Sequence, residues 1–493
     1  MITNNSFSLQ KNMRLVGLSL VLFLSLQAVS ASDKSLKFET RLSGPMLIID
    51  APEFHALKDR QEHHAVPAVS LIVMDKGQVV VSKGYGSLGD GVVPDADTVY
   101  QVGSISKPLA ASVALAMAET GLIDLDTDLK AILTAQGFQL GDFEQQVNLE
   151  MLFGHIAGFN VSGFSGFAPG ATLPTLQDII NGRAPAKEDA IYLDPDQVGD
   201  WSYSGGGYVA AQVALEYLTQ HSYESQAQSR LFDSLGMKRS SFQNPPANAQ
   251  IAHGYTSEGE VAGGWTVYPQ PTAASLWSSA SDMALWLQAI HASFTGKNGH
   301  WGASQVKYLW KMITDVGAFR QGLGFRWGGE GKGLWISANG DTKGYHARVI
   351  LFPETGDGLV LMTNAGNEQA SPFADELVRA VANVYDWPHF QPKLKTLMTE
   401  DTITWDPVVG HYVFEYSDQV SLRVEVDESG NGWMVIVNGE EIGERRPLYA
   451  SDDGNFFTIG GSELVLESGE EGEVAMQLVQ GAGSWGLIRQ TRE

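Results

Sequence analysis

The hydrophobic pattern of this chain changes after Trp387-Pro388, and the change divides the chain into two units that must fold differently. Before it, from about residue 45, strand-like and helix-like segments are mixed. After it, about eight short β-rich runs are separated by turn residues, without a long helical pattern. The length of 493 residues, with 43% apolar and 18% charged residues, is typical of a folded protein with a sizeable core. We therefore predict two domains, at residues 32–390 and 394–493.

The first unit has the pattern of an α+β fold. Its strand patterns lie near both ends, at 69–74, 78–82, 348–352 and 358–363. Its helical patterns lie between them, at 108–119, 208–218 and 283–290. We expect Ser281-Asp282 to cap the last of these helices. Strands at both ends predict one sheet built from the two ends of the unit, with helices packed on it.

The second unit predicts a small antiparallel β-barrel or sandwich. Its turn signals include Asn438-Gly439 and Asp452-Asp453-Gly454-Asn455. Acidic residues are concentrated in it, with 19 Asp and Glu against 7 Lys and Arg in residues 391–493. We interpret this charge as a solubilising surface rather than an acidic docking face.

The N-terminus has the pattern of a cleaved secretory signal peptide. Lys11 and Arg14 precede the apolar run from Leu15 to Leu26, and the small residues of 28–31 suit signal-peptidase cleavage. The run is shorter than the roughly 20 residues that span a bilayer, so a signal at 1–31 is favoured over a membrane anchor. We therefore expect a periplasmic or secreted protein with no stable membrane insertion after cleavage.

Charge and cysteine content exclude several classes of function. A net charge of −25 repels phosphate backbones, so nucleic acid is not an expected partner. The chain has no cysteine, which excludes disulfides, a bacterial lipid anchor and cysteine nucleophiles. The histidines lack metal-ligand spacing such as His-Glu-x-x-His, so we expect neither a metal nor an organic cofactor. Export without cysteine fits a bacterial periplasm.

Ser104-Ile105-Ser106-Lys107 is the first candidate catalytic segment. Residues three apart share one face in the first turn of a helix, and Pro108 suits an early helical position. A serine there has a nearby amine for its proton, a helix N-terminus that favours negative charge, and a backbone N–H for an oxyanion. Ser-x-x-Lys occurs often by chance, and a helix cap beside a solvated lysine is the alternative.

Two later segments give this motif a context. Tyr203 precedes the glycine-rich run 205–207, where a phenol held near cations could act as a base. The alternative is a glycine-rich loop with packing aromatic residues. The third segment, 337–345, lies just before a predicted strand, and its glycines suit a backbone N–H offered to an oxyanion.

In this order, the three segments resemble the serine β-lactamase and penicillin-binding protein superfamily. The likeness is strongest to its class C β-lactamase-related branch of esterases, D-amino-acid peptidases and carboxypeptidases. That family has Ser-x-x-Lys, then Tyr-x-Asn or a variant, then Lys- or His-x-Gly on a strand. The likeness runs from about residue 60 to 390 and includes Val66-Pro67-Ala68-Val69, Gly84-Tyr85-Gly86, residues 121–126, residues 152–158, Leu235-Gly236-Met237 and residues 276–282. The tail resembles the lipocalin-like barrel appended to many such enzymes.

The resemblance implies a β-lactamase/transpeptidase-like antiparallel sheet flanked by helices and followed by a small all-β barrel. It implies Ser104 as the acylated nucleophile, with proton transfers shared by Lys107 and Tyr203. It implies an oxyanion hole made by the backbone N–H groups of Ser104 and Asp341. Among the remaining site positions, the resemblance assigns the following to the oxyanion hole or to substrate binding: Gly340, Gly205 and Asn339.

This chain departs from the family pattern at two positions. Gly205 stands where many relatives have an Asn that contacts the substrate amide, and Ala338 stands where relatives have Lys or His. Candidates to replace that missing cation are Lys343, His346 and Arg348. We expect His155 to hold a turn by hydrogen bonds rather than to act in catalysis. The aromatic residues Phe159, Phe164 and Phe167 either line the cleft or pack in the core.

Together these features predict an exported serine hydrolase that forms an acyl-enzyme on Ser104. The expected substrate is a small ester, a D-amino-acid peptide or a β-lactam-like amide. The alternative is a catalytically weak relative of penicillin-binding proteins that binds cell-wall peptides or a protein partner, for which Ala338 is the main support. No residue pattern here predicts the leaving group or an oligomeric state.

Overall fold

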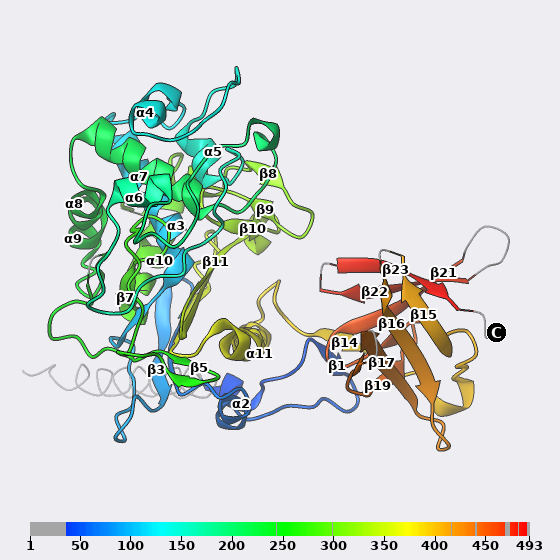
Figure 1. Ribbon diagram of the computed structural model, residues 1–493. Coiled ribbons are helices and arrows are strands. Elements are labelled where there is room, and N and C mark those ends of the chain that lie inside the picture. The colour runs from blue at the N-terminus through cyan, green and yellow to red at the C-terminus, as the bar shows by residue number, and fades with distance from the viewer. Residues whose placement is uncertain are drawn as a thin grey trace, which may run out of the picture.

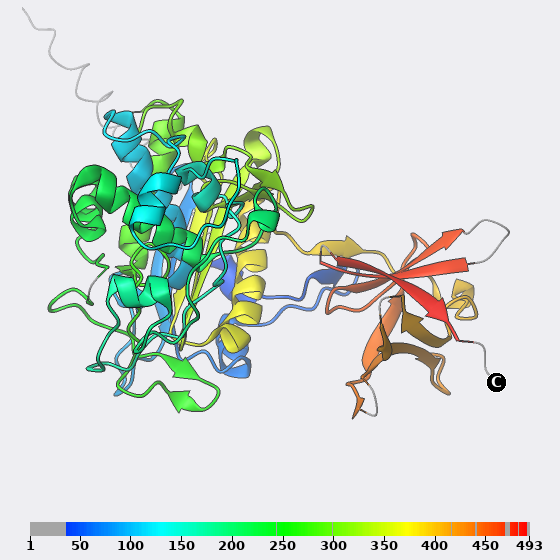
Figure 2. The same cartoon turned by 45° about the horizontal axis from the view of Figure 1, so that its top comes forward.

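The computed structural model describes residues 36–242, 244–297, 299–415, 417–438, 441–468, 474–481 and 483–490. The predicted signal peptide at 1–31 lies outside these residues. The chain forms two bodies, and the segments between them contain strands β1 (Met46–Ile48) and β14 (Lys393–Lys395) (Figure 1). These two strands pair in parallel. A second view shows the same separation of the two bodies (Figure 2). The domain limits 32–390 and 394–493 stay a prediction. The β1–β14 pairing brings together a segment that precedes the first strand of the large sheet and a segment that precedes the first strand of the barrel.

An eight-stranded antiparallel sheet forms the centre of the larger body. In spatial order its strands are β3 (Gln78–Gly86), β2 (Ala68–Asp75), β13 (Gly358–Thr363), β12 (Tyr345–Leu351), β11 (Trp335–Thr342), β10 (Arg326–Gly328), β9 (Arg320–Gln321) and β8 (Thr314–Asp315). β2 pairs with β13 from Val69↔Thr363 to Met74↔Gly358. The sheet is therefore built from both ends of this part of the chain, as the sequence predicts.

Helices cover both faces of this sheet. One face packs against a core that includes α3 (Ser106–Glu119), α7 (Gly205–Thr219) and α10 (Ala280–Phe294). The other packs against α2 (Leu57–His63) and α11 (Asn367–Tyr385) (Figure 1). Every residue of β12 and β13 is buried, because both faces of these central strands are covered. The rest of this body contains α4 (Lys130–Ala135), α5 (Leu149–Phe153), α6 (Leu176–Asn181), α8 (Tyr223–Ala227), α9 (Asp233–Leu235) and the ribbons of β4 (Val99–Gln101) with β7 (Trp277–Ser279) and β5 (Tyr255–Thr256) with β6 (Gly259–Glu260).

Two predicted helix starts are wrong by a few residues. Ser279, not Ser281-Asp282, caps α10, and its side chain accepts from the Asp282 N–H at 3.2 Å. The Asp282 carboxylate instead accepts hydrogen bonds from the Arg239 N–H and the Ser240 hydroxyl. The glycines before Tyr208 form the first turn of α7 rather than a separate turn, because the Ser204 hydroxyl accepts the Gly207 N–H at 2.8 Å.

The smaller body is a closed antiparallel barrel of eight strands, as predicted. In order these are β16 (Ser417–Val426), β15 (Gly410–Phe414), β23 (Gly483–Arg489), β22 (Val474–Gln480), β21 (Ser462–Ser468), β20 (Phe456–Phe457), β19 (Arg446–Ala450) and β17 (Gly432–Asn438). Pairing of β16 with β17 closes the ring, and the short strand β18 (Glu441–Ile442) also pairs with β17. Alternate side chains such as Leu422, Val424 and Met434 fill the interior.

A partly buried ion-pair cluster links α2 to α11. Glu376 accepts two hydrogen bonds of 2.6 Å from the Arg60 guanidinium, and the His64 ring nitrogen lies 3.1 Å from the same carboxylate. Burial alone would raise the pKa of Glu376, but the hydrogen bonds from His64 and Arg60 outweigh it and lower the pKa to about 2. The carboxylate therefore stabilises the fold while it is ionised.

Glu376→Gln tests this stabilisation through its pH dependence. Because the folded-state pKa is below the ordinary value of 4.5, the contribution is complete above pH 4.5 and is lost as pH falls toward 2. We expect the variant to lose about 3 kcal/mol of unfolding free energy at pH 7 relative to the parent protein, and much less near pH 2. Denaturant unfolding at several pH values measures this. Glu354→Gln, at an exposed position in the β12–β13 turn, is the control. A loss that stays constant from pH 7 to 2 would contradict this account.

Candidate active site

Ser104 lies in a short 3₁₀ turn, η2 (Gly103–Ile105), that runs directly into α3. The predicted helix start is thus a tighter turn followed by the helix, and the three-residue spacing still places Ser104 and Lys107 together. Ser106, between them, is fully buried, and its hydroxyl accepts the Leu276 N–H at 3.1 Å. Of the two serines in this motif, Ser106 is therefore structural and Ser104 reaches the cavity.

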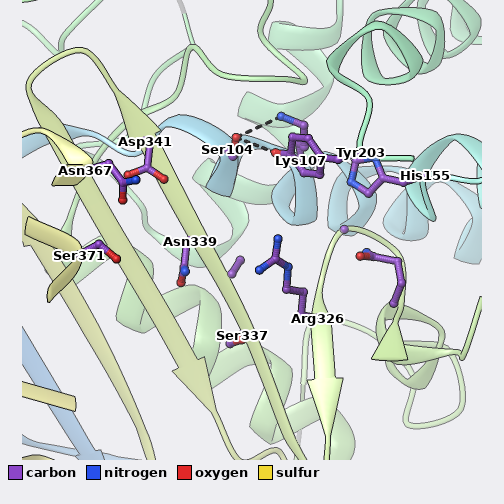
Figure 3. Close-up of a pocket in the computed structure, with 13 residues that line it drawn as sticks. Ser104, Lys107, His155, Tyr203, Arg326, Ser337, Asn339, Asp341, Asn367 and Ser371 are labelled. Carbon is purple, nitrogen blue, oxygen red and sulfur yellow. Dashed lines mark hydrogen bonds between the residues drawn. The ribbon is translucent and has the colours of Figure 1, made fainter. Parts of the chain in front are cut away.

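Two hydrogen bonds converge on the Ser104 hydroxyl (Figure 3). The Lys107 ammonium donates to Oγ at 3.2 Å, and the Tyr203 hydroxyl donates to it at 2.8 Å. Lys107 is only 4% exposed and also donates to the Ala273 carbonyl at 2.8 Å. Its Nζ lies over the rings of Tyr203 and Tyr208, at 4.9 and 5.5 Å from their centroids. The three predicted catalytic side chains are thus brought together from η2, α3 and the segment before α7.

Backbone contact between η2 and β11 places Asp341 beside this serine. A Cβ at Gly340 would lie 1.8 Å from the Val102 carbonyl oxygen, and one at Gly103 would lie 2.7 Å from the Asp341 nitrogen. Gly103 also has a φ of +49°, in the left-handed region that favours glycine. Two glycines therefore allow the edge of β11 to approach the turn that carries Ser104.

His155 supports the tyrosine and does not contact the serine. It is 3% exposed, its Nδ1 accepts the Ser204 N–H at 3.1 Å, and its ring lies 4.5 Å from that of Tyr203. Burial, with the positive charges of Lys107 and Arg326, lowers the pKa of His155 well below its usual value. The ring is therefore neutral and free to accept this hydrogen bond, which agrees with the structural role expected from the sequence.

A cavity of about 400 Å³ opens over Ser104. It is lined by Ser104, Lys107, His155, Tyr203, Gln321, Gly324, Arg326, Ser337, Ala338, Asn339, Asp341, Asn367 and Ser371. Five predicted site residues are therefore in its wall, while Gly340 and Gly205 are not among its lining residues. Within the described ranges, the barrel contributes no residue to this cavity.

The sequence model named Beta-lactamase matches residues 55–383, about two thirds of the chain. The chain belongs to the beta-lactamase family. The match contains Ser104, Lys107, Tyr203 and the whole of β11, so every residue of the cavity lies inside the family region. The barrel lies outside it.

The individual proteins that resemble this chain are distant relatives, with low identity or short matches. The chain is 30% identical over 184 residues to penicillin-binding protein 4 of Amycolatopsis lactamdurans, covering 37% of this chain and 46% of that protein. It is 21% identical over 335 residues to protein flp of Staphylococcus aureus strain MRSA252, covering 66% of this chain and 64% of that protein. The chain thus spans about half to two thirds of the length of these curated relatives.

Solved structures share the fold. An octameric penicillin-binding protein homologue from Pyrococcus abyssi has a TM-score of 0.58 at 19% identity, covering 88% of this chain and 98% of that chain. A beta-lactamase/D-alanine carboxypeptidase from Yersinia pestis complexed with citrate has a TM-score of 0.53 at 17% identity, covering 66% and 95%. At 17–19% sequence identity, the similarity to these two structures shows a shared fold alone.

The third motif lies on a strand of its own, β11, which directly precedes β12, the strand predicted at 348–352. The departures from the family pattern are local, and Ala338 is a small wall residue, 7% exposed. At Gly205, a Cβ would lie 2.9 Å from the ring of Phe164, so this aromatic residue fills the space that an Asn side chain would need. Phe159 and Phe167 are buried, so core packing is the correct alternative for them.

None of the three proposed substitutes for the missing cation lines the cavity. His346 faces the Asp341 carboxylate, with Nδ1 and Oδ1 2.7 Å apart. Arg348 is paired with Asp375 at 2.5 Å, and Lys343 lies beyond the end of β11. Besides Lys107, the described cavity wall contains the cation Arg326, which could not be predicted from the sequence because the three residues of β10 are too few to show a periodic pattern.

Among the described residues, no group of three or more His, Asp or Glu side chains is arranged to hold a metal ion. In the same part of the chain, no helix has both the length and the apolar character needed to cross a bilayer.

Gly340→Ala tests the close approach of β11 to η2. Its added methyl group must displace backbone, so we expect a loss of about 1–3 kcal/mol in stability and of roughly 100-fold or more in hydrolytic kcat/KM. Gly163→Ala is the matched control, because nothing lies within 4 Å of its Cβ position. Thermal unfolding and ester hydrolysis measure the two effects. Unchanged kcat/KM in Gly340→Ala would show that this contact does not shape the site.

Proposed function

We propose that this chain is an exported serine hydrolase that forms an acyl-enzyme on Ser104. The observation that carries the proposal is the pair of hydrogen bonds, from Lys107 and Tyr203, that meet on the Ser104 hydroxyl oxygen. A serine hydroxyl is a weak nucleophile until a neighbouring base accepts its proton. Two such groups at hydrogen-bond distance, in a cavity inside the family region, supply that base.

In the proposed reaction, Ser104 Oγ attacks a substrate carbonyl carbon. Before the attack, Lys107 or Tyr203 gives up its own proton to solvent; the deprotonated group then takes the Ser104 proton and passes it to the leaving group as the carbonyl re-forms. The negative oxygen of the intermediate lies between the backbone N–H groups of Ser104 and Asp341. Water then attacks the acyl-enzyme with the same pair as base, which releases the acid and restores the serine.

The proposed substrates are small esters, D-amino-acid peptides or β-lactam-like amides. Support comes from the family and from relatives described as a penicillin-binding protein and as a beta-lactamase/D-alanine carboxypeptidase. Gly205 favours esters among these, because no amide side chain stands there to position an amide substrate. A catalytically weak protein that binds cell-wall peptides is the second candidate, favoured by the small Ala338 in the cavity wall.

We predict that kcat/KM for a short-chain nitrophenyl ester exceeds that for a chromogenic cephalosporin by at least about tenfold. The ester has a good leaving group, whereas the lactam needs its nitrogen protonated and its amide side chain held. Ser104→Ala should reduce hydrolysis of both by at least about 1,000-fold. Spectrophotometric assays on one preparation give all these values.

Ser106→Ala is the matched control for the serine variant, because its hydroxyl accepts a backbone N–H and does not line the cavity. Parent-like ester hydrolysis by Ser104→Ala would overturn the proposed function. Absence of hydrolysis in the parent protein, with retained binding of cell-wall peptides, would establish the second candidate. A cephalosporin value equal to the ester value would overturn the ester preference alone.

A further inference from the structure

A second cavity, which we name the junction cavity, lies where the larger body meets the barrel. It has a volume of about 230 Å³, and its wall includes residues of β12, α11 and the segment leading into β14, together with the barrel glycines Gly461 and Gly481. Both views show α11 on the side of the larger body that faces the barrel (Figure 1, Figure 2). No described residue lines both this cavity and the one over Ser104, so the two cavities are distinct.

Arg379 of α11 is a cation in this wall without an ionic partner. Its Nε donates to the Ser43 carbonyl oxygen at 3.0 Å. Among the residues that the structure describes, no carboxylate forms an ion pair with Arg379, and nothing accepts a hydrogen bond from its two terminal nitrogens. Burial lowers the pKa of Arg379, because the charged guanidinium is removed from water. A charge in such a position costs free energy until an anion pairs with it.

The acids one helical turn before Arg379 in α11 are already paired with other cations. Asp375 forms an ion pair with Arg348, with Oδ1 and Nη1 2.5 Å apart. Glu376 belongs to the cluster that links α11 to α2. Both carboxylates therefore act on Arg379 only at longer range, and its charge has no direct partner.

The wall of the junction cavity has an excess of positive charge. Its described cations are Arg348, Arg379 and Lys393, and its one described acid is Asp375. Arg348 is only 9% exposed, and its Nε has no hydrogen-bond partner in the described ranges. Lys393 is mostly exposed, and its Nζ lies 3.9 Å from Glu463, a carboxylate outside the wall. This local excess attracts a small anion, although the chain as a whole carries −25.

The same wall also has an apolar part. Pro45, Met46, Val378 and Phe390 line the cavity beside the cations. A ligand that matches both parts has an anionic head group and a short apolar chain. The edge of a guanidinium fits a carboxylate, whose two oxygens can accept two parallel N–H bonds.

We propose that the junction cavity binds a small carboxylate with a short aliphatic chain, and that Arg379 binds its head group. The carboxylate supplies the acceptor and the opposite charge that this guanidinium lacks, while the chain packs on Val378 and Phe390. The site is independent of the proposed function, because it contains none of the residues that line the cavity over Ser104.

Calorimetry on the full chain with hexanoate, its neutral analogue hexanamide and inorganic phosphate tests this site. The parent protein should bind hexanoate at least about tenfold more tightly than hexanamide, which lacks the charge, or phosphate, which lacks the chain. In Arg379→Gln, hexanoate should bind at least about tenfold more weakly. Arg183→Gln is the matched control and should keep the parental affinity, since Arg183 is exposed after α6 and does not line the cavity.

Lys393→Gln, at a mostly exposed position, decides the matter if Arg379→Gln does not fold, and it should weaken hexanoate binding about threefold. Parental affinity in folded Arg379→Gln, or no hexanoate binding by the parent, would overturn the inference. Hexanamide or phosphate binding as tight as that of hexanoate would overturn the carboxylate class. A loss of hexanoate binding in Arg326→Gln instead of Arg379→Gln would place the ligand over Ser104 and would overturn the junction site.

Discussion

Backbone contact between β11 and the turn that carries Ser104 is the constraint on which the rest of the site depends. A side chain at Gly340 would overlap the Val102 carbonyl, and one at Gly103 would overlap the backbone of Asp341. This approach sets the Asp341 N–H near the serine, and the covered central strands hold β11 in place. Because the sheet combines strands from both ends of the family region, the site forms only when that region has folded as a whole.

The polar groups of the site are held by neutral partners. Lys107 is buried against the Ala273 carbonyl and the faces of two tyrosines, and neutral His155 accepts a backbone N–H beside Tyr203. Such partners fix the position of each group without adding an acid that would compete for Lys107. By contrast, the charged groups of the Glu376 cluster pair with one another and connect α2 to α11.

Much of this arrangement could be predicted from the sequence, for physical reasons that differ by element. The β2 and β13 segments are nearly continuous apolar runs, as strands covered on both faces require, and the short β-rich runs separated by turn residues after residue 394 predicted the barrel. Motif spacing placed Ser104 beside Lys107. Arg326 could not be predicted, because its position depends on where β10 leaves β11, a tertiary contact that no local pattern encodes. The Ser279 cap was missed because Ser281 and Asp282 are equally good cap residues by type.

The central claim is that Ser104 becomes covalently acylated, and trapping the adduct tests it most directly. The protein would be treated with a fluorophosphonate, which forms a stable bond to an activated serine, and the modified peptide identified by mass spectrometry. The account predicts one adduct per chain, on Ser104, that does not form when Lys107 and Tyr203 are both replaced. An adduct on another residue, or no adduct on a protein that hydrolyses esters, would contradict it.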